Sequence, residues 1–322
     1  MDISIIIPVY NSASTLRQCL LALNNSSFSD FEVLVVDDKS EDDSVSIARK
    51  FPCKVILLDE NMGPAGARNE GVRQASGEIL LFVDSDMVVH EDAVERIVNT
   101  FEKKPDVSCV SGIYSKKPLL SVGLTGWYRC LQTHYWKKST VGYTTRFTIS
   151  LGAIKRDVFE AVGGFDEEYK KADVEDYEIG HRLVEKGFKL FQDPLIQADH
   201  RDISSFPHLL STVFRRGRMW MSLFFKRRRL DKGYVTPGRS FGLILSLVSL
   251  MALLGSVVFP SLIYTACFSI ILFLISDGGF LWFLLREQGT LSFIPLVVIH
   301  YFTSLARAFG AVAGTFDYIT SK

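Results

Sequence analysis

Short apolar runs alternate with helical segments over the first 110 residues of this 322-residue chain. This alternation limits the possible folds more than any other feature. Strands that are apolar along nearly their whole length must be covered on both faces, as in a parallel sheet between helices. We expect strands at residues 3–7, 32–36, 54–58, 78–83 and 107–112, with helices at 14–23, 42–51, 64–75 and 91–103. The sequence therefore predicts an α/β domain with a mostly parallel sheet and helices on both faces.

The segment 113–150 is rich in aromatic residues and has no regular period. After it we expect a short helix at 155–162, a longer one at about 174–186 and a strand at 188–191. Gly187 stands where helices commonly end with glycine. We place the end of this domain at residue 205, so that the predicted catalytic or binding unit covers residues 1–205.

Residues 206–239 form a basic segment with apolar residues at helical spacing, from Leu209 to Phe225. Its positive charge lies in Arg215, Arg216, Arg218 and the run 226–229. A basic amphipathic helix beside an apolar segment is typical of a membrane surface. The alternative is an ordinary helix packed on the preceding domain.

A membrane region is expected at residues 240–322, because no charged residue occurs from Ser240 to Ser276. We predict spans at about 241–259, 261–276 and 292–316, and an interfacial segment at about 278–289. Pro260 would form the turn between the first two spans. The basic segment before them predicts, by the positive-inside rule, a multi-pass protein of the inner or plasma membrane with a cytoplasmic first domain.

Overall composition excludes few functions. Lysine and arginine number 36, and so do aspartate and glutamate, so that no net positive charge indicates nucleic acid as a partner. The five cysteines have neither metal-ligand nor redox spacing, which indicates reduced thiols. Residues 2–7 lack the positive charge and the length of a signal peptide.

Carboxylates gather where the predicted strands end, which is the edge at which such sheets bind ligands. Asp84-Ser85-Asp86 follows the most apolar strand, and two carboxylates at this spacing suit Mg²⁺ or Mn²⁺ or a ribose. Asp37-Asp38 follows the second strand and is either a turn or a contact to a nucleobase and ribose. Glu175-Asp176 begins a helix, where it serves either as a helix cap or as a general base.

In combination these motifs resemble the family 2 inverting glycosyltransferases of the GT-A fold, as found in membrane-anchored bacterial proteins. The resemblance covers about residues 1–200. It rests on the order of six segments: Ser4–Asn11, Val33–Ser40, Asn61–Ser76 with Gly66-Ala67-Arg68-Asn69, Asp84-Ser85-Asp86, Gly163–Glu167, and Glu175-Asp176 with Arg182. It implies a nucleotide-sugar donor and a divalent metal, Mg²⁺ or Mn²⁺.

The resemblance also implies roles for individual residues. Pro8, Tyr10, Asp37, Asp38, Arg68, Asp84 and Ser85 would bind the donor, with Arg68 reaching the nucleotide. Asp84, Asp86 and His200 would hold the metal. Asp176, with Glu175 beside it, would be the catalytic base. The alternative for His200 is an ordinary surface histidine.

The expected function is therefore transfer of a single sugar, most simply from a UDP-sugar, to a lipid-linked or glycan acceptor at the membrane. Processive synthases of the family carry Gln-x-x-Arg-Trp near the membrane, whereas Arg215–Trp220 here lacks the glutamine and the Arg-Trp pair. A processive polysaccharide synthase and a non-catalytic nucleotide-sugar-binding scaffold stay as alternatives. A dinucleotide-binding enzyme is disfavoured, because Pro8–Asn11 replaces the glycine-rich turn after the first strand.

Overall fold

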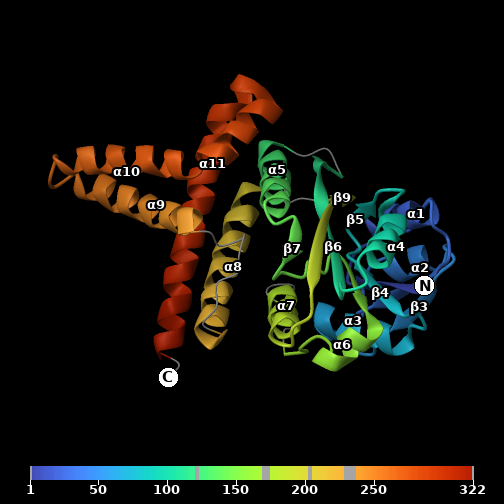
Figure 1. Cartoon of the computed structure of the whole chain (residues 1–322). Helices are drawn as coiled ribbons and strands as arrows, with labels where there is room; N and C mark the ends of the chain where they lie inside the picture. Colours follow the sequence, from blue (N-terminus) through green and yellow to red (C-terminus); the bar gives the residue numbers. More distant parts are fainter. Residues whose placement is uncertain (1, 120–122, 169–174, 202–204, 228–236, 321–322) are drawn as a thin grey trace. The chain divides into compact units, whose positions relative to one another are not determined.

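The computed structural model describes residues 2–119, 123–168, 175–201, 205–227 and 237–320 (Figure 1). The chain divides into two compact units. The first comprises residues 1–120 and 137–201, and the second comprises residues 121–136 and 202–322. The predicted helix start at Val174 and the basic residues 228 and 229 lie outside the described residues.

A nine-stranded mixed sheet forms the centre of the first unit, in the order β3-β2-β1-β4-β8-β6-β9-β5, with β7 also paired to β9. β1 lies parallel to β2 and β4, and β2 lies parallel to β3. β8 is antiparallel to both β4 and β6. The strands are β1 (Ile3–Val9), β2 (Phe31–Asp37), β3 (Lys54–Leu57), β4 (Ile79–Val83), β5 (Met87–Val89), β6 (Cys109–Pro118), β7 (Gly142–Thr144), β8 (Leu151–Lys155) and β9 (Leu190–His200).

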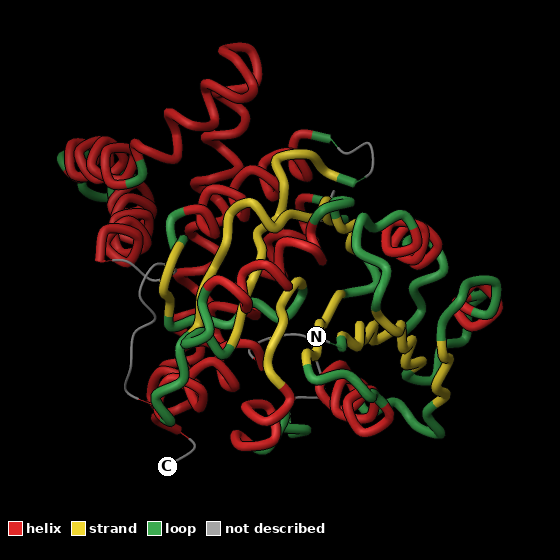
Figure 2. Tube along the Cα trace, turned by 45° about the vertical axis from the view of Figure 1, so that its right-hand side comes forward, coloured by secondary structure: helices red, strands yellow, loops and turns green. Residues whose placement is uncertain are grey.

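Helices cover both faces of this sheet because the side chains of its central strands alternate between two apolar cores (Figure 2). Ile5 and Ile7 of β1 pack with helices α1 and α4 on one face. Ile6 packs with α3, α6 and α7 on the other face. The helices of this unit are α1 (Leu16–Asn24), α2 (Ser44–Ala48), α3 (Gly63–Gln74), α4 (Ala93–Lys103), α6 (Arg156–Val162) and α7 (Glu175–Glu185). The predicted α/β fold class is thus confirmed.

The half of the sheet beyond β4 is less regular than the sequence indicates. β8 inserts antiparallel between β4 and β6, although no strand is expected at residues 151–155. β9 is longer than expected and begins at Leu190, because its second half pairs with both β6 and β5. Helix α5 (Leu124–Lys138) lies inside the aromatic-rich segment, and residues 124–136 of this helix belong to the second unit.

The second unit is helical. It contains most of α5, then α8 (Phe206–Arg227), α9 (Pro237–Gly255), α10 (Leu262–Ser276) and α11 (Gly278–Thr320). Its core joins Tyr128 and Leu131 of α5 to Leu209 and Val213 of α8 and to Phe280 and Leu284 of α11. The backbone leaves helical geometry inside α11 at Gly289, where φ is 74°.

Only α11, among the described residues, is both long and apolar enough to cross a membrane. The predicted spans at 241–259 and 261–276 are two shorter helices, α9 and α10, joined by a turn that contains Pro260. The predicted interfacial segment 278–289 is helical and precedes the break at Gly289. Three separate spans therefore find no support, and a single long apolar helix indicates membrane anchoring.

Small residues allow α8 and α11 to approach closely. A methyl group added at Gly310 would lie 2.1 Å from the backbone oxygen of Phe214, and one at Gly314 would lie 2.1 Å from that of Arg218. On the other helix, Gly217 faces the backbone oxygen of Arg307 in the same way. The Arg218 guanidinium also pairs with Asp317, at 2.5 Å. Backbone contacts of this kind are typical of small-xxx-small helix pairs.

We expect Gly310→Ala to loosen this pair of helices. A single methyl group there meets backbone, which cannot rotate away, and such overpacking costs about 1–3 kcal/mol. The matched control is Gly278→Ala on the same helix, where an added methyl group meets nothing within 4 Å. Thermal unfolding in detergent should show a lower Tm for Gly310→Ala only. Equal Tm values for the two variants would contradict the close packing.

Candidate active site

The parallel strands β1, β2 and β4 end at the same edge of the sheet, and their following loops carry most of the predicted site. Val9 pairs with Asp37 at the ends of β1 and β2. Asn11 and Lys39 in the two loops have positive φ angles of 49° and 65°. Outside glycine, such angles are uncommon and concentrate at functional sites. The Asn11 amide donates to the Ser40 hydroxyl at 2.9 Å, which joins the two loops.

Arg68 connects two of the predicted carboxylates from the inside of the domain. It lies on α3 and is only 2% exposed. Its guanidinium is 2.6 Å from Asp84 Oδ1 and 3.4 Å from Glu175 Oε1. Burial alone would lower the pKa of Arg68, but these two carboxylates outweigh it and raise the pKa above its usual value. Arg68 thus ties the end of β4 to the start of α7.

Asp86 and His200 form a second pair, next to Asp84. The His200 Nε2 atom is 3.4 Å from Asp86 Oδ2, and the imidazole stacks on Tyr114 with 4.6 Å between ring centroids. Lys137 lies 4.2 Å from the centre of the same Tyr114 ring. Burial would raise the pKa of Asp86, but His200 outweighs this effect and lowers it. Asp86 therefore favours the ionised form that metal binding requires.

The two carboxylates after β2 differ in their contacts. Asp38 accepts hydrogen bonds from the backbone N–H groups of Met62 and Gly63, at 2.6 and 2.9 Å, at the start of α3. Asp37 Oδ2 accepts one from the Ser40 amide at 3.0 Å, whereas its buried Oδ1 has no partner among the described residues. Both side chains hold the backbone around the site. Their predicted contacts with a nucleotide stay predictions.

The remaining predicted donor residues lie on the same edge. Tyr10 is 53% exposed, and Pro8 lies two positions before it, near the end of β1. The Ser85 hydroxyl donates to the Ser12 hydroxyl at 2.8 Å. An exposed aromatic ring beside buried carboxylates offers a stacking face for a nucleobase.

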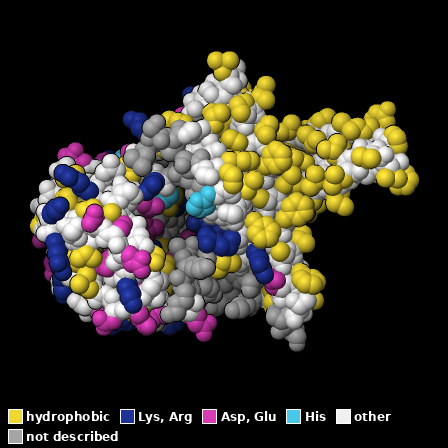
Figure 3. Space-filling model, turned by 180° about the vertical axis from the view of Figure 1, so that it is seen from behind, with side chains coloured by type: hydrophobic (Ala, Val, Ile, Leu, Met, Phe, Trp, Pro, Cys, Tyr) yellow, Lys and Arg dark blue, Asp and Glu magenta, His cyan; other side chains and the backbone are white. Residues whose placement is uncertain are grey.

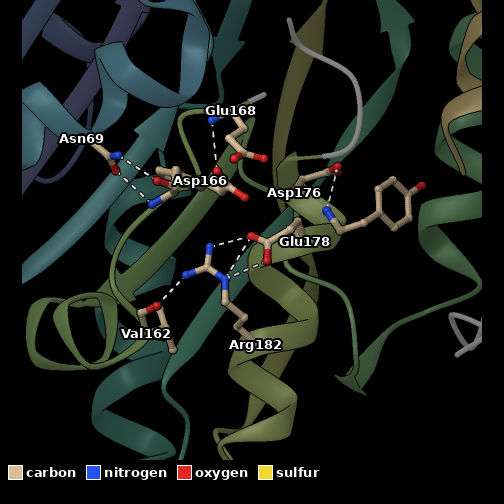
Figure 4. A network of polar contacts seen from close by, with 9 residues as sticks. Asn69, Val162, Asp166, Glu168, Asp176, Glu178 and Arg182 are labelled. Carbon is tan, nitrogen blue, oxygen red and sulfur yellow. Dashed lines mark hydrogen bonds and ion pairs between the residues drawn. The ribbon is translucent and has the colours of Figure 1, made fainter. Parts of the chain in front are cut away.

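Helix α7 brings the predicted base to the site (Figure 4). The Asp176 carboxylate accepts a hydrogen bond from the Tyr177 amide at 3.0 Å and lies 3.6 Å from the Arg146 guanidinium. Arg146 also lies over the Tyr177 ring, at 4.8 Å. Sequence reasoning missed Arg146, because it stands alone between β7 and β8 without a motif around it. Farther along α7, Glu178 and Arg182 form an ion pair at 2.6 Å.

A loop before α7 is held in place by Asn69 of α3. Its side-chain amide donates to the Phe165 carbonyl and to Glu167, both at 2.9 Å, and its oxygen accepts from the Phe165 amide. Gly163 and Gly164 have positive φ angles of 83° and 71°. Only glycine adopts such angles at low cost, so the Gly-Gly pair lets this loop turn toward Asn69.

A divalent metal fits this site only together with a ligand from outside the protein. No group of three histidine, cysteine, aspartate or glutamate side chains lies close enough to hold a metal within the described ranges. Asp86 and His200 offer one oxygen and one nitrogen ligand. Mg²⁺ and related ions are commonly held by one or two carboxylates plus substrate phosphates. The residues present therefore fit a metal shared with a diphosphate.

We expect Arg68→Met to destabilise the first unit strongly. Removing the guanidinium leaves Asp84 and Glu175 without their buried partner, and breaking such a pair costs about 3–5 kcal/mol. The control is Arg73→Met on the same helix, whose side chain is 55% exposed and pairs with Glu70 at the surface. This change should cost under about 1 kcal/mol. Urea unfolding of both variants measures the difference, and similar midpoints would refute the role given to Arg68.

The sequence is similar to that of known glycosyltransferases. Residues 4–163 match the family Glycosyl transferase family 2. Glycosyltransferase AglE of Haloferax volcanii is 42% identical over 105 residues, which are 30% of this chain and 34% of that protein. Poly(ribitol-phosphate) beta-glucosyltransferase of Bacillus spizizenii is 38% identical over 117 residues, which are 34% of this chain and 18% of that protein. The similarity thus spans about a third or less of these two relatives.

The solved structures include a relative that aligns along most of the chain. The mannosyltransferase PcManGT from Pyrobaculum calidifontis, in complex with GDP-Man and Mn²⁺, has a TM-score of 0.58 at 19% identity. The alignment covers 99% of this chain and 87% of that one. At this identity the likeness shows the fold alone, and that fold is GT-A. Residues 4–163 therefore match a family 2 glycosyltransferase domain, and the chain has the GT-A fold.

Proposed function

We propose that this chain is a metal-dependent inverting glycosyltransferase. It moves a single sugar from a nucleotide-sugar, most simply a UDP-sugar, to a lipid-linked or membrane-proximal acceptor. One observation carries the proposal: Arg68 joins Asp84 to Glu175, so that the Asp86–His200 pair and Asp176 lie in one fixed constellation. A rigid set of this kind is what transfer between two bound substrates needs.

The reaction needs a proton acceptor for the attacking hydroxyl. Asp176 would take this proton while the acceptor oxygen bonds to the anomeric carbon and the bond to the nucleoside diphosphate breaks. Attack opposite the leaving group inverts the configuration at that carbon. Arg146, 3.6 Å from Asp176, would hold the carboxylate in place. Glu175 stays paired with Arg68 and would serve as a structural support rather than as the base.

Negative charge develops on the leaving diphosphate, and this charge must be neutralised. Asp86 and His200 would hold Mg²⁺ or Mn²⁺, which supplies Lewis-acid stabilisation at the diphosphate oxygens when bound. Asp84 keeps one oxygen on Arg68, and its other oxygen would be available to the ribose or the metal. Tyr10, exposed at the end of β1, would stack on the base, with Pro8, Asp37, Asp38 and Ser85 around the nucleotide.

The acceptor and the location are further parts of the proposal. The basic residues of α8 and the apolar helices that follow support a place at the cytosolic face of the inner or plasma membrane. Arg215–Trp220 lies inside α8 and lacks the motif of processive enzymes, which supports transfer of one sugar. A lipid-linked acceptor would meet the enzyme where its sugar or phosphate leaves the bilayer.

A calorimetric panel on the detergent-solubilised chain tests the donor site. It uses UDP, GDP and dTDP, each with and without Mn²⁺. We expect Mn²⁺-dependent binding of one nucleoside diphosphate, which names the base. If none binds with Mn²⁺, the carboxylates are structural and the transferase proposal fails. If one binds but no radiolabelled sugar reaches a membrane lipid extract, the alternative of a nucleotide-sugar-binding scaffold is supported instead.

A further inference from the structure

The hairpin of α9 and α10 exposes most of its large apolar side chains, whereas a helical hairpin in water would bury them. The buried side chains of these two helices are mostly small or weakly polar (Ser246, Ser249, Ala252, Ala266 and Ser269), together with Leu245 and Phe273. Most of the large apolar side chains are exposed instead: Phe241, Ile244, Val248, Met251, Leu254, Phe268, Ile271 and Ile275. Figure 3 shows hydrophobic side chains covering this hairpin on the face in view. Small residues inside and large apolar ones outside are typical of helices packed in lipid.

Charge is confined to one end of the hairpin. Arg239 and Asp277 bracket it at its base, and no charged residue lies between them. The Asp277 carboxylate is 3.0 Å from the His300 Nε2 atom of α11. At the tip, Val257 is 85% exposed and Val258 is 71% exposed. A tip that emerged into water on the far side of a bilayer would place these apolar side chains, rather than charged ones, in contact with water.

The backbone at the tip also satisfies its own hydrogen bonds. The amides from Ser256 to Phe259 donate to carbonyls of the last turn of α9, at 2.9–3.3 Å. Pro260 has no N–H group, and the Leu262 amide donates to the Phe259 carbonyl at 3.0 Å. Unpaired backbone groups are what usually keeps turns out of hydrocarbon. Few backbone groups of this turn are unpaired, so the turn can lie in hydrocarbon.

Length further limits how far the hairpin reaches. α10 has 15 residues and α9 has 19. At 1.5 Å per residue they measure about 22 and 28 Å. The hydrocarbon core of a bilayer is about 30 Å thick. The shorter arm therefore falls short of a full crossing when its charged end stays at the surface.

The exposed apolar side chains of helix α11 from residue 291 onward lie on one side of the helix. The exposed residues from 291 to 319 are all apolar: Leu291, Ile294, Val298, Phe302, Phe309, Val312, Phe316 and Ile319. The charged Asp317 is partly exposed and pairs with Arg218. At 3.6 residues per turn these positions fall within an arc of about 100°. The stripe is about 42 Å long, longer than the hydrocarbon core of about 30 Å. A one-sided stripe of this length suits a helix that lies along the membrane surface.

We infer that the second unit is a monotopic membrane anchor. The α9–α10 hairpin enters the bilayer from one face and ends inside the hydrocarbon, and α11 lies in the plane of that face with its apolar stripe toward the lipid. The partner of both surfaces is the acyl-chain region of the lipid bilayer. This anchor does not depend on the transfer reaction proposed above.

Cysteine labelling in sealed membrane vesicles of either orientation tests the hairpin. The background is C53A/C267A, which removes the two cysteines that are not buried. Val258→Cys at the tip is compared with Ser29→Cys, an exposed position of the first unit. We expect a membrane-impermeant maleimide to label Ser29→Cys from one side. Val258→Cys should be labelled from neither side until detergent is added.

Two results overturn the re-entrant hairpin. Labelling of Val258→Cys from the side opposite to Ser29→Cys would show a hairpin that crosses the membrane. Labelling from the same side in intact vesicles would show a hairpin that lies in water. Thermal unfolding of each variant in detergent, compared with the C53A/C267A background, verifies that the chain is folded and keeps the two outcomes interpretable.

Nitroxide labels test the orientation of α11. Ile294→Cys and Phe316→Cys lie on the exposed stripe, about 33 Å apart along the helix. If α11 lies in the membrane plane, both labels should show the same accessibility ratio for oxygen and for a water-soluble nickel reagent. If α11 crosses the bilayer, the two labels should lie at opposite surfaces and be reached by impermeant reductant from opposite sides. The second result would overturn the in-plane arrangement.

Discussion

Asp176→Asn is expected to lower kcat for transfer to a hydroxyl acceptor by roughly 10²–10⁴-fold, the range contributed by a general base. The Tyr177 backbone N–H donates a hydrogen bond to the Asp176 carboxylate at 3.0 Å. Asparagine has the same size, so its side-chain oxygen should still accept this hydrogen bond. What it loses is the capacity to take a proton. Initial rates with a defined acceptor measure the effect, and calorimetry should show unchanged affinity for the nucleoside diphosphate.

The control for this variant lies on the same helix. Glu185→Gln at the end of α7 removes an exposed carboxylate of the same charge, away from the start of the helix where Asp176 lies. It should leave kcat within about twofold of the original, because surface substitutions of this kind change little. Full activity of Asp176→Asn toward a hydroxyl acceptor would sink the assignment of the base. Full activity only toward an anionic phosphate acceptor would instead show that the acceptor needs no deprotonation.

The part of the fold that follows from local pattern is the parallel half of the sheet. Strands such as Ile3–Val9 and Ile79–Val83 are apolar at almost every position. This pattern is typical of strands that are covered on both faces of a sheet. Parallel strands that lie side by side end at one edge, so the loops that follow them must meet there. The strand pattern alone is therefore enough to predict that Asp84, Asp86 and the Asp37-Asp38 pair lie at one edge of the sheet.

The other half of the sheet depends on pairings between distant residues. β8 lies about 70 residues after β4 in the chain and pairs with it in antiparallel register, from Ile79–Lys155 to Val83–Leu151. The five residues of β8 contain no feature that specifies β4 as the partner strand. Helix α5 packs against other helices and has aromatic side chains on several sides. Its sequence therefore shows no simple helical period of apolar residues.

The site shows the same limit at the level of single residues. The resemblance assigned Arg68 to the nucleotide, while the structure places its guanidinium on Asp84 and Glu175. A motif identifies a residue that is needed, but not the partner it contacts. Arg146 has no motif, and only the fold brings it within 3.6 Å of Asp176. Its contact therefore had no signal in the sequence.

Asp86→Asn is expected to abolish the dependence of nucleotide binding on Mn²⁺. Asp86 is the ionised member of the pair with His200, and its pKa is lowered mainly because His200 outweighs the effect of burial. Loss of partners around a metal site already costs about 10–100-fold in metal affinity. Loss of a ligand itself should cost at least as much. Isothermal titration of the nucleoside diphosphate, with and without Mn²⁺, measures the change, and transfer activity should fall in parallel.

The comparison needs a carboxylate that is close in sequence but has no part in the site. Asp92→Asn meets this need, because Asp92 is largely exposed and pairs with Arg96 on the surface, at 2.6 Å. It should leave metal-dependent binding unchanged. His200→Gln should weaken the dependence on Mn²⁺ less than Asp86→Asn does, because it exchanges one neutral ligand for another, whereas Asp86→Asn removes a negative charge. Two results would contradict this prediction: Asp86→Asn that keeps the original Mn²⁺-dependent affinity, and EDTA-treated enzyme that turns over at its full rate. Either result would mean that Asp84 and Asp86 hold the loops together and that the reaction proceeds without a metal at Asp86.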